Sequence, residues 1–154
     1  MAQRKTLQGN ACPVARSVDV MGDRWALLIV RDAFDGLRRF GEFQRSLGMA
    51  KNILADRLRK LVAQGILETS PGADGSAYQD YALTAKGQAL FPVIVGLRQW
   101  GEQNLFAPGE PHSVLKERSS GAPVPALVVR AQDGRALAPV MTWVEKLPGS
   151  TDST

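Results

Sequence analysis

The chain has 154 residues, which is the length of one ordinary domain and short for two independently folded cores. Its composition, with 44% hydrophobic and 22% charged residues, excludes a disordered or fibrous protein. A single cysteine, Cys12, and a single histidine, His112, supply too few ligands for a structural zinc site and too few groups for the usual catalytic sets. We therefore expect one domain with an appendage, without enzyme activity, metal or other cofactor.

The net charge of +4 is unevenly distributed along the chain. Residues 1–64 hold 12 Lys/Arg against 6 Asp/Glu, whereas residues 65–154 hold 7 against 9. This asymmetry favours contact with a polyanion, although a solvated basic surface would also account for it. No apolar run reaches the roughly 18 residues that span a membrane, and the N-terminus lacks the apolar core of a secretory signal. We expect a cytoplasmic protein without membrane contact.

The N-terminal third of the chain predicts two helices after a flexible polar tail of residues 1–10. The stretch CPVARSVDVMG predicts a short helix with Pro13 in its first turn, where no N–H donor is needed, and Gly22 at its end. Asp23 is then a suitable N-cap for DRWALLIVRDAF. Apolar side chains nearly surround this second helix, which is the pattern of a helix buried in the middle of a small domain.

A helix-turn-helix pattern follows. The stretch RRFGEFQRSLG predicts a short helix that places Phe40 and Phe43 on one face and ends at Gly48. Two residues later, AKNILADRLRKLVAQ predicts an amphipathic helix that ends at Gly65. Two helices joined by a tight turn that contains glycine are typical of helix-turn-helix proteins.

The pattern then changes to that of a hairpin and a long helix. Residues 66–69 and YQDYALT predict two strands joined by PGADGSA, with Tyr78 or Tyr81 packed inward. A hairpin directly after a helix-turn-helix is a wing. Thr84 begins a helix that reaches residue 106, and Pro92 predicts a kink or break near Phe91.

The last part of the chain is rich in Gly and Pro. Residues 107–147 predict a small β-hairpin appendage, in which ALVVRAQDGRALAPVMTWVEKL forms two strands joined at Asp133 and Gly134. Residues 148–154 predict a disordered tail.

The polar face of the 50–64 helix is the candidate functional site. Its leucines form a stripe that packs on the preceding helices, and its other face carries the polar side chains. A solvated face is one interpretation. The alternative is DNA, because residues 38–60 contain seven Lys/Arg against Glu42 and Asp56, and free N–H groups at a helix N-terminus favour phosphate.

The types of side chain suggest a division of labour on DNA. Asn can contact adenine, Lys can reach guanine, and a carboxylate can accept from cytosine. The predicted base readers are Lys51, Asn52 and Asp56, although Asp56 could instead pair with Lys60 four residues on. The predicted phosphate contacts are Arg38, Arg39, Arg45, Arg57, Arg59 and Lys60.

Three stretches carry a family resemblance over about residues 11–105: CPVARSVDVMGDRWALLIVRDAFDGLRRFGEF, AKNILADRLRKLVAQGILE and YALTAKGQALFPVIVGLRQWGE. They resemble the HxlR-type winged helix-turn-helix transcription regulators, relatives of the MarR group. The resemblance implies an α+β fold, namely a winged helix-turn-helix over residues 11–106 with dimerisation helices, followed by the small C-terminal β appendage. It further implies a recognition helix at 51–64, a wing at 66–83 and a dimer helix at 84–106.

The resemblance also implies a homodimer that binds successive major grooves of a pseudo-palindromic DNA site. The expected interface residues come from the first and last helices: Val14, Val18, Leu90, Ile94, Leu97 and Trp100. MarR-like dimers often bind small molecules, which raises the possibility of an effector pocket near Trp25 and Trp100.

Two departures from the family pattern concern the wing and the tail. The wing tip SPGADGSA holds Asp74 and no Lys or Arg, which implies a weak or only steric role. Many relatives end in a ribbon with two cysteine-containing knuckles, whereas the matching stretches here read ERSSG and RAQDG. We therefore expect a ribbon without metal ligands, held by Val128, Val129, Val140 and Trp143.

Cys12 falls at the position that often senses oxidants or electrophiles in this family. A thiolate at a helix N-terminus is favoured by the helix dipole, and Arg16 lies one turn on. The alternative is a small buried residue without a redox role.

The sequence thus predicts a sequence-specific DNA-binding regulator, a repressor that acts as a homodimer, and leaves open whether Cys12 senses redox or electrophile stress or has only a structural role. The competing prediction is a winged-helix protein-interaction module that has lost specific DNA binding. Asp56 and the acidic wing tip favour the second prediction, and the basic cluster at 38–60 favours the first.

Overall fold

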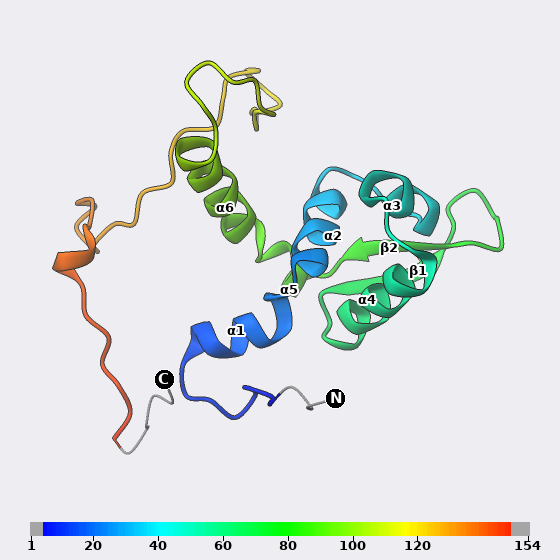
Figure 1. Cartoon of the computed structure of the whole chain (residues 1–154), viewed down its shortest axis with the longest axis horizontal. Coiled ribbons are helices and arrows are strands. Elements are labelled where there is room, and N and C mark those ends of the chain that lie inside the picture. Colours follow the sequence, from blue (N-terminus) through cyan, green and yellow to red (C-terminus); the bar gives the residue numbers. More distant parts are fainter. Residues whose placement is uncertain (1–4, 149–154) are drawn as a thin grey trace. The chain divides into compact units, whose positions relative to one another are not determined.

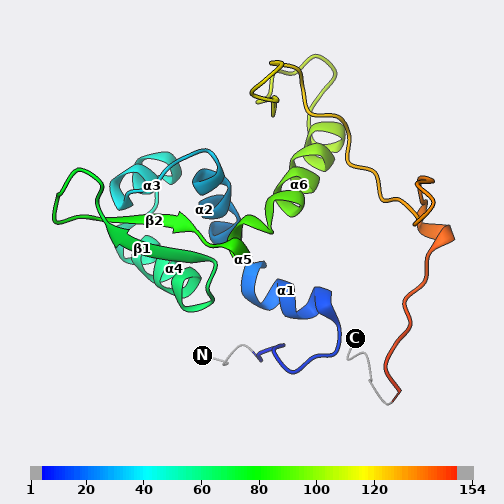
Figure 2. The same cartoon turned by 180° about the vertical axis from the view of Figure 1, so that it is seen from behind.

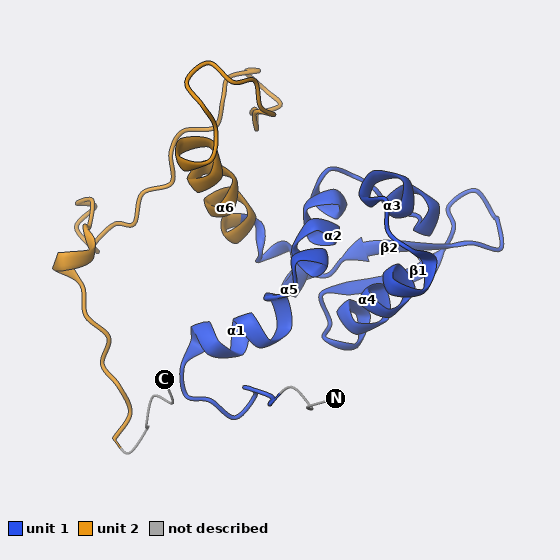
Figure 3. Ribbon diagram, viewed as in Figure 1, with its two compact units in different colours: residues 1–91 blue, residues 92–154 orange. Residues whose placement is uncertain are grey.

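The computed structural model describes residues 5–148, which fall into two compact units divided between Phe91 and Pro92 (Figure 3). Figure 1 shows the elements of both units: α1 (Pro13–Met21), α2 (Arg24–Phe34), α3 (Phe40–Leu47), α4 (Lys51–Ala63), β1 (Leu67–Pro71), β2 (Gln79–Leu83), α5 (Ala85–Gln88), α6 (Phe91–Asn104) and the 3-10 helix η1 (Pro139–Met141). The predicted α+β fold with a winged helix-turn-helix is confirmed.

The first helices begin and end where the sequence predicts. Pro13 is the first residue of α1, and Gly22 is its C-cap. The Asp23 side chain accepts a hydrogen bond from the backbone N–H of Trp25 at 3.4 Å and so caps α2. A cap of this kind satisfies a backbone donor that would otherwise lack a partner within the helix.

The core of the first unit is formed where α4 packs against α2, α3 and β1. Gly48 adopts the left-handed conformation (φ 62°) that lets the chain turn sharply between α3 and α4. Leu54, Leu58 and Leu61 of α4 are fully buried, as are Phe43 of α3 and Ile29 of α2. Burial of each such side chain stabilises the fold by about 1.5–3 kcal/mol relative to exposure. The predicted leucine stripe is therefore the face that holds α4 in place.

The wing is a two-stranded antiparallel sheet in which Leu67 pairs with Leu83 and Pro71 with Gln79. The backbone N–H of Tyr81 donates to the carbonyl of Arg38 at 2.7 Å, which ties β2 to the segment before α3. The Tyr81 ring contacts Phe43 edge-on at 6.4 Å between centroids. Tyr81 is thus the inward tyrosine, and Tyr78 is 73% exposed.

The expected long helix after the wing is divided in two, as Pro92 predicted. The Thr84 hydroxyl accepts from the backbone N–H of Gly87 at 3.1 Å and begins α5. The chain leaves helical geometry after Gln88 and resumes it at Phe91, so that Pro92 lies in the first turn of α6. A proline is tolerated there because no earlier carbonyl needs its missing N–H.

The second unit differs from the predicted β appendage. Beyond α6, the part of the chain that the structure describes contains the isolated bridges Lys116↔Pro123 and Arg130↔Ala136 and the short η1, but no strand. The expected two strands are therefore reduced to tight turns, one of them at Asp133 and Gly134. Val128, Val129, Val140 and Trp143 are exposed and do not form a core. Pro139, the first residue of η1, lacks the N–H donor that a longer second strand would need.

Both ends of the chain were predicted to be irregular. Residues 1–4 and 149–154 lie outside the described residues. The rest of the N-terminal tail makes specific contacts with α1, because the Thr6 hydroxyl donates to Asp19 at 3.0 Å and Arg16 donates to the Asn10 carbonyl at 2.5 Å. Within the described residues, no helix is both long and apolar enough to span a membrane.

Gly87 provides a test of the packing between α5 and the wing. A methyl group at this buried position would overlap the carbonyl of Ile66, which also accepts from the N–H of Thr84 at 3.1 Å. We expect Gly87→Ala to lower the free energy of unfolding by about 1–3 kcal/mol, measured by urea denaturation. Gly101→Ala is the matched control, because no atom lies near that methyl position; equal destabilisation by both changes would contradict this packing.

Candidate nucleic-acid interface

The leading turn of α4 presents polar side chains to solvent. Lys51 and Asn52 are exposed together with the apolar Ile53 and Ala55, whereas Leu54 and Leu58 are buried. The burial of the leucines therefore determines which side chains can meet a partner. Two of the three predicted base readers, Lys51 and Asn52, lie on this exposed face.

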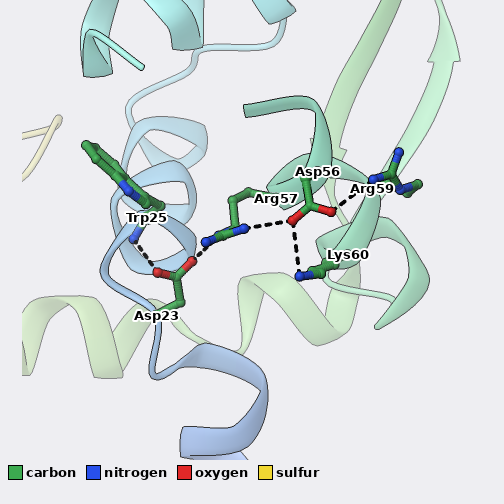
Figure 4. Close-up of polar contacts among 6 residues, drawn as sticks. All are labelled: Asp23, Trp25, Asp56, Arg57, Arg59 and Lys60. Atoms are coloured by element: carbon green, nitrogen blue, oxygen red, sulfur yellow. Dashed lines mark hydrogen bonds and ion pairs between the residues drawn. The ribbon is translucent and has the colours of Figure 1, made fainter. Parts of the chain in front are cut away.

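Asp56, the third predicted base reader, is engaged by three cations of its own helix (Figure 4). Its carboxylate oxygens lie 2.7 Å from Arg57, 2.9 Å from Arg59 and 3.1 Å from Lys60. Hydrogen bonding by Lys60, then by Arg59 and Arg57, holds the pKa of Asp56 below its ordinary value. Of the two alternatives for Asp56, pairing with Lys60 is present in the structure. A base contact by Asp56 stays a prediction that requires the carboxylate to release a cation.

Arg57 points back into the first unit and links α4 to the start of α2. Its Nε lies 2.5 Å from Asp23, the residue that caps α2, while its Nη1 contacts Asp56 (Figure 4). The side chain is 28% exposed, and the hydrogen bond with Asp23 raises its pKa. Arg57 is therefore a structural link first, in contrast to Arg59 and Lys60, which are exposed and paired only along their own helix.

Arg39 fastens the wing to the segment before α3. Its guanidinium contacts Asp74 of the wing tip at 2.8 Å and Asp80 of β2 at 3.2 Å. Arg39 lowers the pKa of Asp74, and the hydrogen bond with Asp74 raises that of Arg39. The acidic wing tip is thus compensated by an internal cation, a relation that no pattern in the sequence indicated.

Glu42 caps the start of α3. Its carboxylate accepts from the backbone N–H groups of Arg38 at 2.8 Å and Arg39 at 2.9 Å. These two hydrogen bonds hold the pKa of Glu42 below its ordinary value of 4.5. The negative charge also offsets the positive end of the helix dipole, so α3 begins at a fixed point next to the wing.

A groove joins α3, the start of α4 and the wing. Its walls include the two exposed cations Arg45 and Lys51. Tyr78 and Gln79 of the wing and Gln44 of α3 complete this part of the lining. The sequence did not assign Gln44, Tyr78 or Gln79 to the interface, and named Tyr78 only as a candidate for the inward tyrosine of the wing. An exposed tyrosine beside two cations suits a sugar-phosphate backbone.

A second hollow lies between the end of α2, β2 and α5. It is lined by Phe34, Leu83, Phe91 and Arg38, among other side chains, and the rings of Phe34 and Phe91 lie 5.3 Å apart. Arg38, a predicted phosphate contact, is exposed at the rim of this hollow. Trp25 is not part of the lining; its ring lies under the guanidinium of Arg24 at 4.8 Å.

Cys12 occupies the N-cap position of α1 and is half-buried. Its backbone N–H donates to the Asn10 side chain at 2.8 Å. Arg16, which the sequence placed near the thiol, donates to the Asn10 carbonyl instead. Asn10 therefore holds the start of α1 through hydrogen bonds with Cys12 and Arg16, and the half-buried Cys12 lies at this end of the helix.

The predicted dimer residues differ in exposure. Val14 and Val18 of α1 and Leu97 and Trp100 of α6 are exposed, whereas Leu90 and Ile94 are half-buried. The exposed four offer apolar surface of the kind that a partner could cover.

The stretches ERSSG and RAQDG are closed by polar contacts. Glu117 accepts hydrogen bonds from Ser119 and Ser120, which lower its pKa, and Arg135 contacts Asp133 at 2.8 Å. Residues 5–148 contain no cluster of three or more His, Cys, Asp or Glu side chains that could hold a metal ion.

Comparison with known proteins places this arrangement in a family. The model of the HxlR-like helix-turn-helix family matches residues 20–108, which is more than half of the chain. This chain belongs to the HxlR-like family. The uncharacterized HTH-type transcriptional regulator Mb3122 of Mycobacterium bovis is 41% identical over 108 residues, which are 70% of this HxlR-like chain and 68% of Mb3122. The protein is accordingly a transcriptional regulator with a helix-turn-helix domain, and not an enzyme.

Solved structures resemble this HxlR-like chain to different extents. The crystal structure of PA1607, a candidate transcription factor, is 58% identical with a TM-score of 0.87, and the match covers 91% of this chain and 98% of PA1607. The redox regulator HypR in its reduced form is 32% identical with a TM-score of 0.57, and the match covers 61% of this chain and 94% of HypR.

The lowered pKa of Glu42 makes the stability of this region depend on pH. The carboxylate contributes fully above its ordinary pKa of 4.5, and the contribution is lost as the pH falls through the lower pKa of the folded protein. We expect Glu42→Gln to reduce the free energy of unfolding by about 1 kcal/mol at neutral pH, and the difference from wild type to shrink in acid. Urea denaturation across this pH range measures both effects, and Glu68→Gln at an exposed position of β1 is the control. A difference that stays constant down to about pH 2 would contradict the capping role.

Proposed function

We propose that this HxlR-like regulator binds double-stranded DNA sequence-specifically as a homodimer and represses transcription. The observation that carries the proposal is the exposed leading turn of α4, where Lys51 and Asn52 lie beside the groove that contains Arg45. A helix N-terminus with an exposed Lys and Asn offers donors both to phosphates and to base edges in a major groove. Repression needs no further surface, because a dimer on a promoter site would obstruct polymerase by itself.

The roles of the cations follow from their contacts. Lys51 and Asn52 are the proposed base readers, and Arg45, Arg38, Arg59 and Lys60 the proposed phosphate contacts. Exposed ion pairs are worth only about 0–1 kcal/mol, so phosphates can compete with Asp56 for Arg59 and Lys60. Arg39 and Arg57 act indirectly in this proposal, because their ion pairs with Asp74, Asp80 and Asp23 hold the wing and α2 in position.

The homodimer is supported by the exposed apolar side chains of α1 and α6. Val14, Val18, Leu97 and Trp100 would each be covered by a second copy. Two copies would also present two α4 helices to a pseudo-palindromic site.

The competing function, a protein-interaction module without DNA binding, was favoured by acidic residues at the interface. Asp56 and Asp74 are both neutralised by cations of the same chain. For the exposed cations Arg45 and Lys51, the only acidic side chain among the described residues that line the groove is Glu42. The Glu42 carboxylate accepts hydrogen bonds from backbone N–H groups. These contacts favour DNA.

A redox response through Cys12 is the second part of the proposal. HypR, which aligns with this chain, is named a redox regulator, and Cys12 lies half-buried at the N-cap of α1. With one cysteine per chain, Cys12 can form a disulfide only with a second chain or with a separate thiol compound. A small-molecule effector would fit the hollow lined by Phe34 and Phe91 better than a site at Trp25.

DNA binding can be measured by fluorescence anisotropy on a duplex selected from a random pool. We expect Lys51→Ala and Asn52→Ala each to reduce discrimination between selected and random duplex by about 1–3 kcal/mol. Arg45→Ala should weaken both duplexes alike and reduce the slope of log Kd against log salt by about 1. Lys116→Ala, an exposed change in the second unit, is the control. Equal affinity of wild type for both duplexes at physiological salt would refute sequence-specific binding.

The redox proposal predicts that diamide changes DNA affinity in wild type but not in Cys12→Ser. Two Cys12 thiols would be oxidised to one disulfide while diamide is reduced to the hydrazine. A non-reducing gel should show a covalent dimer that dithiothreitol reverses. If wild type and Cys12→Ser respond alike, Cys12 is not the sensor.

A further inference from the structure

The second unit exposes apolar side chains on a segment with little packing of its own. Between residues 128 and 144, Val140 is 91% exposed, Trp143 80% and Val129 70%, and Val128, Met141 and Val144 are exposed as well. Figure 2 shows residues 128–147 as a long irregular trace that contains only the short η1. A group of exposed apolar side chains is a typical feature of an interaction site.

The segment before it is fastened to α6. The Gln99 side chain donates to the Pro125 carbonyl at 3.0 Å and accepts from the N–H of Leu127 at 2.7 Å. Arg98 donates to the hydroxyl of Ser113 at 2.7 Å. From residue 128 to 142, the hydrogen bonds connect near neighbours, such as Leu137 with Val129 at 2.8 Å. The chain is therefore anchored to α6 up to Leu127, and the apolar side chains of Val128, Val129 and residues 140–144 are exposed.

A matching apolar face lies on α6 of the same unit. Val93, Leu97 and Trp100, spaced four and three residues apart on one side of the helix, are 49%, 50% and 58% exposed. The central part of each surface lacks charge, because residues 91–97 and residues 136–144 contain no Asp, Glu, Lys or Arg. The two surfaces thus match in their apolar character, and both are exposed within one chain.

The comparison structures show that this segment belongs to a subset of relatives. The match to PA1607 covers 91% of this chain and 98% of that crystallised chain, whereas HypR matches only 61% of this chain with 94% of its own. The extension beyond α6 is therefore shared with some relatives, and the helix-turn-helix fold does not require it.

We propose that residues 128–147 form an arm that packs on the Val93, Leu97 and Trp100 face of a second copy of the chain. In a dimer with a twofold axis, each arm packs on the α6 face of the other copy. The same contact therefore covers both arms and both helix faces. A second copy fits better than an unrelated protein because the same chain supplies both halves of the contact. The inference rests on the proposed homodimer and deepens it by assigning the arm to its interface.

Cysteine crosslinking between two differently tagged chains tests the contact directly. Both chains carry Cys12→Ser, one carries Leu97→Cys and the other Trp143→Cys, and they are co-expressed and oxidised with copper phenanthroline. Because each chain then has one thiol, a disulfide between the two tags requires the arm of one copy to reach α6 of the other. We expect a disulfide between the chain with Leu97→Cys and the chain with Trp143→Cys. We expect the same result when Val93→Cys replaces Leu97→Cys. Tyr78→Cys on the exposed wing, paired with Leu97→Cys, is the matched control and should give only background.

A second measurement does not depend on crosslinking. Val140→Asp combined with Trp143→Asp should raise the dimer dissociation constant about 30-fold or more, as expected when an aromatic anchor is lost, measured by sedimentation. Val140 and Trp143 are exposed within one chain, so replacing them should not unfold it, and misfolding would not account for a weaker dimer. Tyr78→Asp is the control.

The outcomes separate the arm from the proposed function. A dimer that binds DNA but gives no mixed disulfide above the Tyr78→Cys control overturns the arm contact and leaves the DNA-binding homodimer standing. A disulfide formed mainly within one chain that carries both Leu97→Cys and Trp143→Cys also overturns it. A chain that is monomeric when it binds DNA overturns both.

Discussion

The burial of Leu54, Leu58 and Leu61 is the constraint on which the interface depends. These three side chains fix the rotation of α4 against α2, α3 and β1, because turning the helix would expose apolar surface worth about 1.5–3 kcal/mol per side chain. Lys51 and Asn52 face solvent as a consequence. The interface is thus determined by the hydrophobic side of α4 as much as by its polar side.

Ion pairs within the chain distinguish the cations of residues 38–60, and Arg59 and Lys60 pair with Asp56 of their own helix. Arg57 and Arg39 are held by acidic side chains of other elements, and this fixes the start of α2 and the wing relative to the helix-turn-helix. Arg45 and Lys51 line the groove and remain exposed. Counting positive charges does not separate these cations, because the count does not show which of them already has a counter-ion on another element.

The second unit shows what an extension can add to a small DNA-binding fold. Gln99 and Arg98 hold residues 113–127 along α6, and the following segment carries valines and tryptophan that its own chain leaves exposed. Glu117 and Asp133 close two turns of this extension through contacts with Ser120 and Arg135. The extension keeps its turns through local polar contacts, so its apolar side chains are available for another surface.

The sequence by itself determined the helices, their caps, the wing and the break at Pro92, because caps, glycines and apolar periodicity act over a few neighbouring residues. It also identified the exposed turn with Lys51 and Asn52. Only the tertiary structure decided that Asp23 holds Arg57, that Arg39 holds Asp74, and that Tyr81 and not Tyr78 is inward. Those contacts join residues far apart in the chain, where spacing carries no information. The exposure of Trp143 and its neighbouring valines was missed for the same reason, since an apolar strand pattern does not show whether a chain has its own core to fill.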